Sequence, residues 1–251
     1  MDAEFAGRYA RLEEDHWWFR ARRRILKALL PRDIAWHKGI RVLEIGCGPG
    51  GNLREIYPDV AELTGLEPNA GNAKWAAQHS RAQVHVGAIG DLPTQIKKNG
   101  YDVACLFDVL EHIENDADAL AEIKGLLGAD GALVLTVPAF MWLWGLQDIV
   151  SKHYRRYTRQ GLADLLNTCG FTVRRATYFN TFLFPAVAVA RFIARGRVPP
   201  QDCGYSDFDN NPSWARWLLY RVFALEASLL PHISFPFGVS LYVVATVKEK
   251  A

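Results

Sequence analysis

Short apolar runs of strand length alternate with segments of helical period along most of this chain. We expect strands at the segments IRVLEIG (40–46), ELTGLEP (62–68), AQVHVG (82–87), YDVACLFDV (101–109), GALVLTVP (131–138), FTVRRATYF (171–179) and GVSLYVVATVK (238–248). Helical patterns lie between them, and the clearest are NAGNAKWAAQHS, DADALAEIKGLL and TRQGLADLLNTCG, the last of which ends in a glycine stop. This alternation predicts an α/β fold with a largely parallel sheet.

Two parts of the chain fall outside this alternation. In residues 1–39, Ile25, Leu26 and Leu29 recur at helical spacing, so we expect an N-terminal helical cap that packs before the first strand. Residues 180–237 hold two further helical patterns, TFLFPAVAVARFIARG and PSWARWLLYRVFALEASLLP, joined by the loop-like VPPQDCGYSDFDNNP. We therefore predict a helical insertion between the sixth and seventh strands.

The composition is that of an ordinary globular protein. The 251 residues are 50% apolar and 22% charged, which suits a single domain over residues 1–251 with one insertion. A formal net charge of +2 gives no reason to expect a nucleic-acid partner.

The N-terminus lacks the apolar core of a signal peptide, and the longest apolar run, FLFPAVAVA, is too short for a membrane helix, which needs about 20 residues. Four cysteines without paired or metal-ligand spacing indicate reduced thiols, so we expect a cytoplasmic protein.

The first candidate for chemistry is a glycine-rich loop after the first predicted strand. GCGPGG (46–51) satisfies the GxGxxG spacing, which dinucleotide and nucleoside sites share. It is not a phosphate-binding P-loop, because no Gly-Lys-Ser/Thr sequence follows it. Pro49 also removes a backbone N–H group that could have held a pyrophosphate.

One carboxylate precedes this loop, and a second one ends the next predicted strand. Glu44 would repel a phosphate group but suits a ligand that carries a cationic ammonium group. Glu67, 21 residues beyond Gly46, is placed to accept hydrogen bonds from both hydroxyls of a ribose. S-adenosylmethionine has an ammonium, a sulfonium and a ribose but no phosphate, so we predict it as the cofactor. The alternatives are an NAD(P)-dependent oxidoreductase, against which Glu44 and Pro49 argue, and a glycine-rich turn without a ligand.

The order of motifs resembles that of the class I S-adenosylmethionine-dependent methyltransferases. The resemblance rests on VLEIGCGPG, LTGLEPN, VGAIGDLP, YDVACLFDVLEHI and GALVLTVP, and it covers roughly residues 40 to 180 plus the last strand. Within the class, the chain looks most like the ubiquinone-pathway O-methyltransferases and their bacterial relatives. The resemblance implies a Rossmann-like, seven-stranded, mostly parallel sheet with the last strand antiparallel and helices on both faces.

The same resemblance assigns residues to the parts of the cofactor. Carried over by motif, the methionine end is lined by Glu44, Gly46, Cys47 and Gly48, the ribose by Glu67 and Pro68, and the adenine by Ala88 and Ile89, with Asp108 beside the cofactor. Many relatives have an aspartate where Ala88 stands, and Asp91 is the nearby carboxylate that could replace it. In relatives an arginine from an early helix can meet the cofactor carboxylate, which here indicates Arg20 or Arg24 in DHWWFRARRR (15–24). The alternative for that segment is an amphipathic helix with a solvated basic face.

Two histidines are candidates for a general base that removes the proton of an acceptor hydroxyl. His112 lies in DVLEHI at the end of the fourth strand, and His153 lies in SKHYRRYT (151–158) after the fifth. These strand ends meet at the cofactor edge of such a sheet, and histidine titrates near the working pH. Alternatively, His112 fixes the loop or contacts the cofactor. Asp108, Glu111 and His112 could ligate a metal, but no second acidic pair lies nearby, so we predict no metal site.

The 151–158 loop also offers contacts for the acceptor. We expect Tyr154, Arg155, Arg156 and Tyr157 to bind it, because arginines suit a carboxylate or phosphate group. Alternatively, the segment is a solvated basic turn in which Thr158 caps the next helix.

The insertion at residues 180–237 should lie at the cofactor edge, because it joins a parallel strand to an antiparallel one. It could form a lid over the substrate, contact a membrane surface peripherally, mediate a homodimer, or bury its own small core. We predict an S-adenosylmethionine-dependent methyltransferase that methylates an oxygen of a small-molecule or lipid-like acceptor. C- or N-methylation and a non-catalytic cofactor-binding module are the alternatives.

Overall fold

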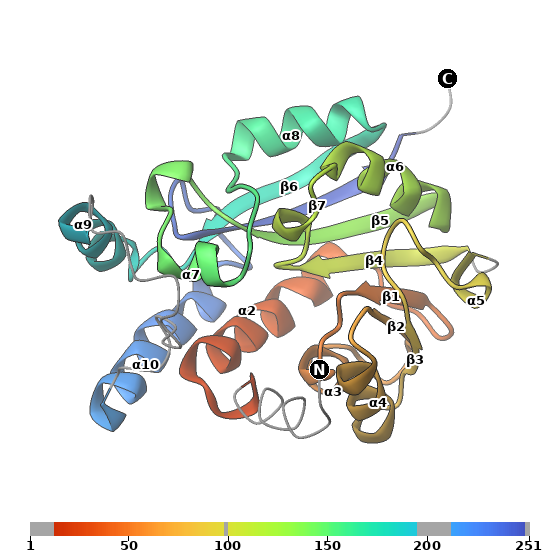
Figure 1. Ribbon diagram of the computed structural model, residues 1–251, viewed down its shortest axis with the longest axis horizontal. Helices are drawn as coiled ribbons and strands as arrows, with labels where there is room; N and C mark the ends of the chain where they lie inside the picture. Colours follow the sequence, from red (N-terminus) through yellow and green to blue (C-terminus); the bar gives the residue numbers. More distant parts are fainter. Residues whose placement is uncertain (1–12, 98–99, 195–211, 249–251) are drawn as a thin grey trace.

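The computed structural model of the protein describes residues 13–97, 100–194 and 212–248, and it has a seven-stranded sheet at its centre (Figure 1). The strand order is β3-β2-β1-β4-β5-β7-β6. The strands are β1 (Arg41–Ile45), β2 (Glu62–Glu67), β3 (Gln83–Val86), β4 (Tyr101–Phe107), β5 (Leu127–Pro138), β6 (Phe171–Phe179) and β7 (Ser240–Val247). Strands β1 to β5 pair in parallel, and β7 lies antiparallel between β5 and β6. The predicted fold class is therefore confirmed.

Helices cover both faces of this sheet. They are α2 (Trp17–Asp33), α3 (Gly51–Glu55), α4 (Ala70–His79), α5 (Thr94–Lys97), α6 (Asp116–Leu126), α7 (Leu146–Val150), α8 (Arg159–Thr168), α9 (Phe184–Ala194) and α10 (Ser213–Leu229), with short 3₁₀ helices η1 (Leu110–His112) and η2 (Met141–Leu143). Helices α5, α6 and α8 pack on one face, and α2, α3, α4 and α10 pack on the other. Figure 1 shows α7 and α9 beyond the end of the sheet at which β4 finishes.

The sheet has a hydrophobic core on each face because its central strands are apolar on both sides. In β4, Val103, Cys105 and Phe107 belong to one core, whereas Ala104 and Leu106 belong to the other. Successive side chains of a strand point to opposite faces. Parallel strands that are covered on both faces therefore appear in the sequence as continuous apolar runs.

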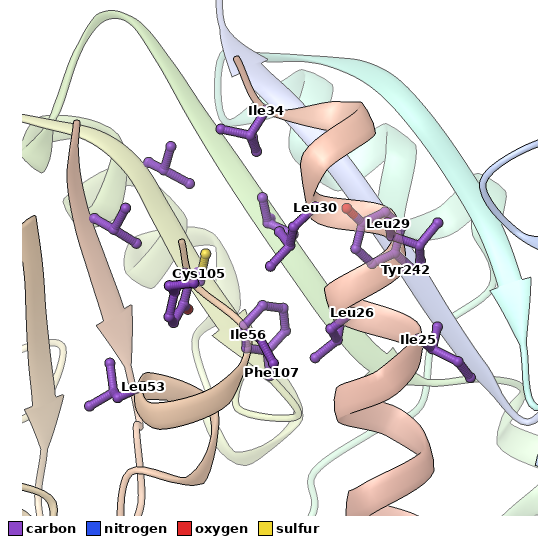
Figure 2. Close-up of a cluster of buried hydrophobic side chains, with 14 of the residues drawn as sticks. Ile25, Leu26, Leu29, Leu30, Ile34, Leu53, Ile56, Cys105, Phe107 and Tyr242 are labelled. Carbon is purple, nitrogen blue, oxygen red and sulfur yellow. The ribbon is translucent and has the colours of Figure 1, made fainter. Parts of the chain in front are cut away.

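Helix α2 contributes much of the core on its face of the sheet. Ile25, Leu26 and Leu29 are almost completely buried. Figure 2 shows these side chains turned toward the sheet, close to Phe107 and Tyr242. Burial of each such aliphatic side chain stabilises the fold by about 1.5–3 kcal/mol. The apolar face of α2 is thus fixed against the strands. The rotation of the helix about its axis is thereby set, and with it the set of remaining α2 side chains that point toward the strand ends.

Helices α9 and α10 lie between β6 and β7. The two ends of this insertion are neighbours, because Phe179 pairs with Ser240 in the antiparallel ladder. Glu226 of α10 is fully buried and accepts hydrogen bonds from the backbone N–H groups of residues 180–182 at 2.7, 2.7 and 2.9 Å. A single carboxylate therefore fastens α10 to the beginning of the insertion.

Strand β5 begins at Leu127, four residues earlier than predicted, because Leu127 already pairs with Tyr101. Most of the predicted loop VPPQDCGYSDFDNNP lies outside the described residues. Among the helices that the structure describes, none is both long enough and apolar enough to cross a lipid bilayer.

Candidate active site

A cavity of about 570 Å³ opens where the parallel strands end. Its wall is formed by helix α2, the glycine loop after β1, the loops after β4 and β5, and helix α9. Of the residues that the sequence pattern had singled out, the cavity is lined by Gly46, Cys47, Gly48, Asp108, Glu111, His112, His153 and Arg156. The fold therefore brings both candidate bases and the glycine loop to one space.

The glycine loop has a backbone shape that glycine adopts easily and other residues do not. Gly46 and Gly48 have φ angles of 68° and 55°, in the left-handed region. A Cβ atom on Gly46 would lie 2.6 Å from a methyl carbon of Val109, so no side chain fits there. The N–H group of Gly46 donates to the carbonyl of Leu66 at 2.7 Å, which ties the loop to β2. A ligand can therefore approach this backbone closely.

Glu44 stands behind the loop and does not line the cavity. Its fully buried carboxylate accepts hydrogen bonds from Asn52 Nδ2 at 2.9 Å and from the Tyr57 hydroxyl at 2.7 Å. Burial raises the pKa of Glu44 to about 7, although both hydrogen bonds oppose the rise. Because Asn52 does line the cavity, Glu44 supports a residue that faces a ligand. Its own contact with a ligand ammonium stays a prediction.

Glu67 holds the loop from the side of β2. Its buried carboxylate accepts hydrogen bonds from the backbone N–H groups of Gly48 and Asn69, both at 3.0 Å. Desolvation raises the pKa of this carboxyl group. The same side chain therefore orders the loop and remains the predicted acceptor for the ribose.

Pro68, predicted at the ribose, and Ala88 and Ile89, predicted at the adenine, lie outside the cavity wall. Pro68 is exposed, and Ala88 and Ile89 are half-buried after β3. The N–H group of Asp91 donates to the carbonyl of Ala88 at 3.0 Å and closes a tight turn, with the Asp91 side chain exposed. Contacts of these residues with a cofactor stay predictions.

Arg22, which the sequence pattern did not single out, is an arginine of α2 that reaches the cavity. It is almost completely buried, forms an ion pair with Asp108, and lies 4.8 Å from the ring centroid of Trp18. Arg20 and Arg24 are exposed and do not line the cavity. The helical period was a signal that could have found Arg22, because it shares a face with the buried aliphatic residues of α2.

Asp108 itself has an unusual backbone conformation. Its φ of 57° is in the left-handed region, which residues other than glycine seldom adopt. The conformation is held by the hydrogen bond from its N–H group to the carbonyl of Thr136 at 2.9 Å. Strain of this kind is concentrated at functional sites, which supports the assignment of this strand end to the active site.

Glu111, His112 and His153 meet at the cavity wall, and we call them the Glu–His–His cluster. The rings of the two histidines lie edge to face with centroids 4.5 Å apart. Nδ1 of His153 is 2.9 Å from a carboxylate oxygen of Asp148. Glu111 is fully buried, and neither of its carboxylate oxygens has a hydrogen-bond partner in the described part of the chain.

Arg156 lines the cavity, but its charge is already balanced. Its guanidinium binds the buried carboxylate of Asp148 through Nε at 2.7 Å and Nη2 at 3.0 Å. It also donates to the carbonyl of Ala139 at 3.1 Å. An anionic acceptor would therefore have to compete with an internal ion pair.

The other predicted acceptor contacts lie away from the cavity. Arg155 forms an ion pair with Asp116 at 2.8 Å, and the hydroxyl of Tyr157 donates to the same carboxylate at 2.9 Å. Tyr154 is exposed. These side chains shape the loop after β5, and any contact with an acceptor stays a prediction.

The groups around the cavity fit S-adenosylmethionine. The carboxyl groups of Glu13, Asp108 and Glu111 at the wall offer oxygen acceptors, which suit an ammonium group. Asn52 adds a buried side-chain oxygen with no partner among the described residues. Arg22 is a cation at the wall that is paired with Asp108, so a ligand carboxylate would share it with this ion pair.

The fold is that of the class I S-adenosylmethionine-dependent methyltransferases. It has seven strands with β7 antiparallel, a glycine loop after β1, and a cavity at the ends of the parallel strands. The model of the methyltransferase domain family matches residues 15–176, well over half of the sequence. The chain belongs to this methyltransferase domain family, whose cofactor is S-adenosylmethionine. The predicted family is therefore confirmed.

Individual relatives agree with this assignment. A protein of Mycolicibacterium smegmatis named "Probable S-adenosylmethionine-dependent methyltransferase" is 29% identical over 166 residues, 64% of this chain and 62% of that protein. The ubiquinone biosynthesis O-methyltransferase of a Caulobacter species is 27% identical over 133 residues, 51% of this chain and 52% of that protein. The chain thus spans less than two-thirds of the length of these relatives.

Solved structures show the same fold at low sequence identity. A methyltransferase in complex with the Haloferax volcanii Trm112 activator has a TM-score of 0.64 and 17% identity, and the match covers 99% of this chain and 96% of that one. The cyclase SpnF has a TM-score of 0.60 and 19% identity, with 93% and 83% covered. Since one of these proteins is named for a different reaction, the fold alone does not establish the reaction.

Proposed function

We propose that the protein transfers the methyl group of S-adenosylmethionine to an oxygen of a small-molecule or lipid-like acceptor. The observation that carries this proposal is the cavity, whose wall combines the glycine loop and Asp108 with the Glu–His–His cluster and apolar residues of α9. Donor and acceptor can be aligned in one space, and alignment of two reactants lowers a barrier by about 7–11 kcal/mol.

The cofactor side of the site consists of the glycine loop and its supports. Gly46 to Gly48 and Arg22 would hold the methionine end, Glu67 the ribose, and Ala88 and Ile89 the adenine. When bound, S-adenosylmethionine supplies a methyl group that its positively charged sulfonium activates.

The Glu–His–His cluster would accept the proton of the acceptor hydroxyl. The carboxylate of Asp148 accepts a hydrogen bond from Nδ1 of His153, so in the neutral ring the lone pair lies on Nε2. His112 lies beside it and is the second candidate. A general base placed in this way accelerates a reaction by about 10²–10⁴-fold.

The insertion gives the acceptor side an apolar wall. Leu183, Ala186 and Val187 line the cavity from α9 and the residue before it. An acceptor with a hydrocarbon portion would bury that portion there, which favours a lipid-like or aromatic compound. Helix α9 would then act as the predicted lid.

The outer surface of α9 and α10 suits contact with an anionic membrane. Phe192, Trp214 and Trp217 have exposed fractions of 70%, 71% and 63%. Arginines accompany them, among them Arg221, which lies 5.6 Å from the ring centroid of Trp217. Aromatic and basic side chains together are typical of helices that lie in a membrane interface. A homodimer contact is the competing use of this surface.

A cytoplasmic location is the remaining part of the proposal. Cys47 and Cys105 are buried free thiols. Burial raises the pKa of both, so neither is a reactive thiolate at neutral pH. Unpaired thiols suit a reducing compartment.

Ligand-dependent thermal unfolding tests the cofactor part of this proposal. S-adenosylhomocysteine at a hundred times its Kd should stabilise the fold by about 2.7 kcal/mol, while NAD and NADP should leave the Tm unchanged. Methyl-labelled S-adenosylmethionine, incubated with polar and lipid extracts of cells, should then label a product whose oxygen–methyl bond mass spectrometry identifies. Stabilisation by NAD in place of S-adenosylhomocysteine would refute the methyltransferase proposal.

A matched pair of histidine variants tests the base. His153→Gln should lower kcat by about 10²-fold or more while S-adenosylhomocysteine affinity is kept. His37→Gln changes an exposed histidine outside the cavity wall and should behave like the wild type. An unchanged kcat in both His153→Gln and His112→Gln would show that neither histidine is the base.

A further inference from the structure

The Glu–His–His cluster has the composition and spacing of a metal site. One ligand atom from each of Glu111, His112 and His153 can be chosen so that all three lie within 4.8 Å of one another. Bonds of about 2.0–2.2 Å to a four-coordinate zinc ion place its ligand atoms about 3.3 Å apart, so the three side chains would move closer together when the ion binds. We propose that this cluster binds a divalent transition-metal ion such as Zn²⁺ at the wall of the cavity.

The state of Glu111 is a second observation that points to a cation. Its carboxylate is fully buried and lines the cavity, yet both oxygens lack a partner among the described residues. An unpartnered buried carboxylate is costly. Two guanidiniums are nearby, but Arg22 is paired with Asp108 and Arg156 with Asp148. A bound cation would supply the partner that Glu111 lacks.

The surroundings of the histidines prepare them for ligation. Asp148 accepts the hydrogen bond of His153 Nδ1 at 2.9 Å, which leaves Nε2 for a metal. Such carboxylate–histidine–metal arrangements orient the ring and increase its basicity. The loops that carry the ligands are joined by the hydrogen bond from Tyr154 N–H to the Glu111 carbonyl at 2.8 Å.

The ligand set selects the kind of metal. Two imidazole nitrogens and one carboxylate suit Zn²⁺, Co²⁺ or Fe²⁺, whereas Mg²⁺ and Ca²⁺ prefer oxygen ligands throughout. Three protein ligands leave an open coordination position. Because all three residues line the cavity, an acceptor oxygen could take that position and release its proton to water more readily; in the metal-bound protein this would replace proton transfer to a histidine. Only this role rests on the proposed function, since metal binding itself does not need an acceptor.

The proposal replaces the sequence expectation that no metal is bound. That expectation considered Asp108, Glu111 and His112 as a local group and found no second acidic pair. The missing ligand is His153, 41 residues beyond His112, and the fold supplies it through the loop after β5.

Metal titration of the untagged, chelator-treated full chain tests the site. We expect one Co²⁺ per chain, with visible absorption bands that Zn²⁺ abolishes by displacement. Glu111→Gln, His112→Ala and His153→Ala should each weaken Zn²⁺ binding by at least about 10-fold. His79→Ala and His232→Ala change exposed histidines and should leave the affinity unchanged.

A second measurement needs no variant. In the wild-type protein, Zn²⁺ should protect His112 and His153 from carbethoxylation, as read by mass spectrometry, but not His79. Absence of saturable Co²⁺ absorption, or equal labelling with and without Zn²⁺, would overturn the metal proposal. Stoichiometric metal binding without any methyl transfer would leave the metal site standing and instead count against the proposed function.

Discussion

Glu44 keeps a proton in the folded protein over a pH range in which the unfolded chain has lost it. Burial raises the pKa of Glu44 from 4.5 to about 7. Between these values the folded state binds more protons than the unfolded state, so a rise in pH through this window lowers the free energy of unfolding. The full difference corresponds to about 3 kcal/mol.

We expect Glu44→Gln to flatten this pH dependence. Between pH 5.5 and 8.5 the wild type should lose about 2 kcal/mol that the variant does not lose. Denaturant unfolding at the two pH values measures the difference. Glu62→Gln removes an exposed carboxyl group of the adjacent strand β2 and should follow the wild type. Equal slopes for wild type and Glu44→Gln would contradict the retained proton.

Arg22 and Arg24 allow a matched test of the cofactor site. Arg22→Gln should weaken S-adenosylhomocysteine binding by about 10–100-fold, because a hydrogen bond to a charged group is worth about 1.5–3 kcal/mol. Arg24→Gln changes an exposed arginine of the same helix and should keep wild-type affinity. Calorimetry on both variants, with the Tm of each recorded, gives the comparison. If the affinity fell only in Arg24→Gln, the cofactor carboxylate would be bound elsewhere.

The sequence predicted a residue of the site well where a motif and its position after a strand both pointed to that residue. It predicted less well where the direction of a side chain decides whether the residue reaches the cavity. Asp108, His112 and His153 all line the cavity, as expected from their places after strand ends. Arg22 was missed because adjacent arginines of one helix differ only in the face they occupy. Glu44 shares a face of β1 with core residue Val42, so strand alternation already places it beneath a covering layer.

The elements themselves were the most predictable level of the structure. Internal strands such as β4 and β7 follow largely apolar runs, and α8 ends beside a glycine with a φ of 84°. The beginning of β5 was not predictable, because Leu127–Asp130 carries little pattern and joins the strand through its pairing with β4. Pairing between distant segments leaves no local trace in the sequence.

Glu226 makes a prediction at the level of elements. Its carboxylate accepts three backbone N–H groups that join α10 to the end of β6. Glu226→Gln should destabilise the protein by about 1–3 kcal/mol, because an amide N–H₂ then faces donors that have lost their acceptor. Glu62→Gln, which changes an exposed carboxyl group of β2, is the control and should change stability by less than about 0.5 kcal/mol. Denaturant unfolding of both variants measures this, and equal stabilities would show that α10 is held by apolar packing alone.

Membrane contact is a prediction for the whole molecule. Flotation with vesicles of anionic phospholipid should carry the protein upward, and high salt should weaken this binding through its basic component. Trp214→Ala with Trp217→Ala should abolish flotation, whereas Trp36→Ala, which changes a partly buried tryptophan outside α9 and α10, should not. A wild-type protein that stays with the soluble fraction, and that sedimentation shows to be a dimer lost in the double variant, would assign the surface to a second copy.

The chain leaves the sheet at Phe179 and returns at Ser240, and these two residues are paired. Because closing a loop costs entropy that grows only slowly with its length, the α9 part of the segment between them can be lengthened, shortened or exchanged without redesign of the sheet, whereas α10 is held by its packing in the core. The glycine loop and Asp108, which would hold the methyl donor, belong to the first half of the sequence, whereas the apolar wall for the acceptor belongs to the insertion. The two parts of the site can therefore change independently of each other. A lineage with this architecture can diversify the compounds it modifies while it keeps a single source of methyl groups.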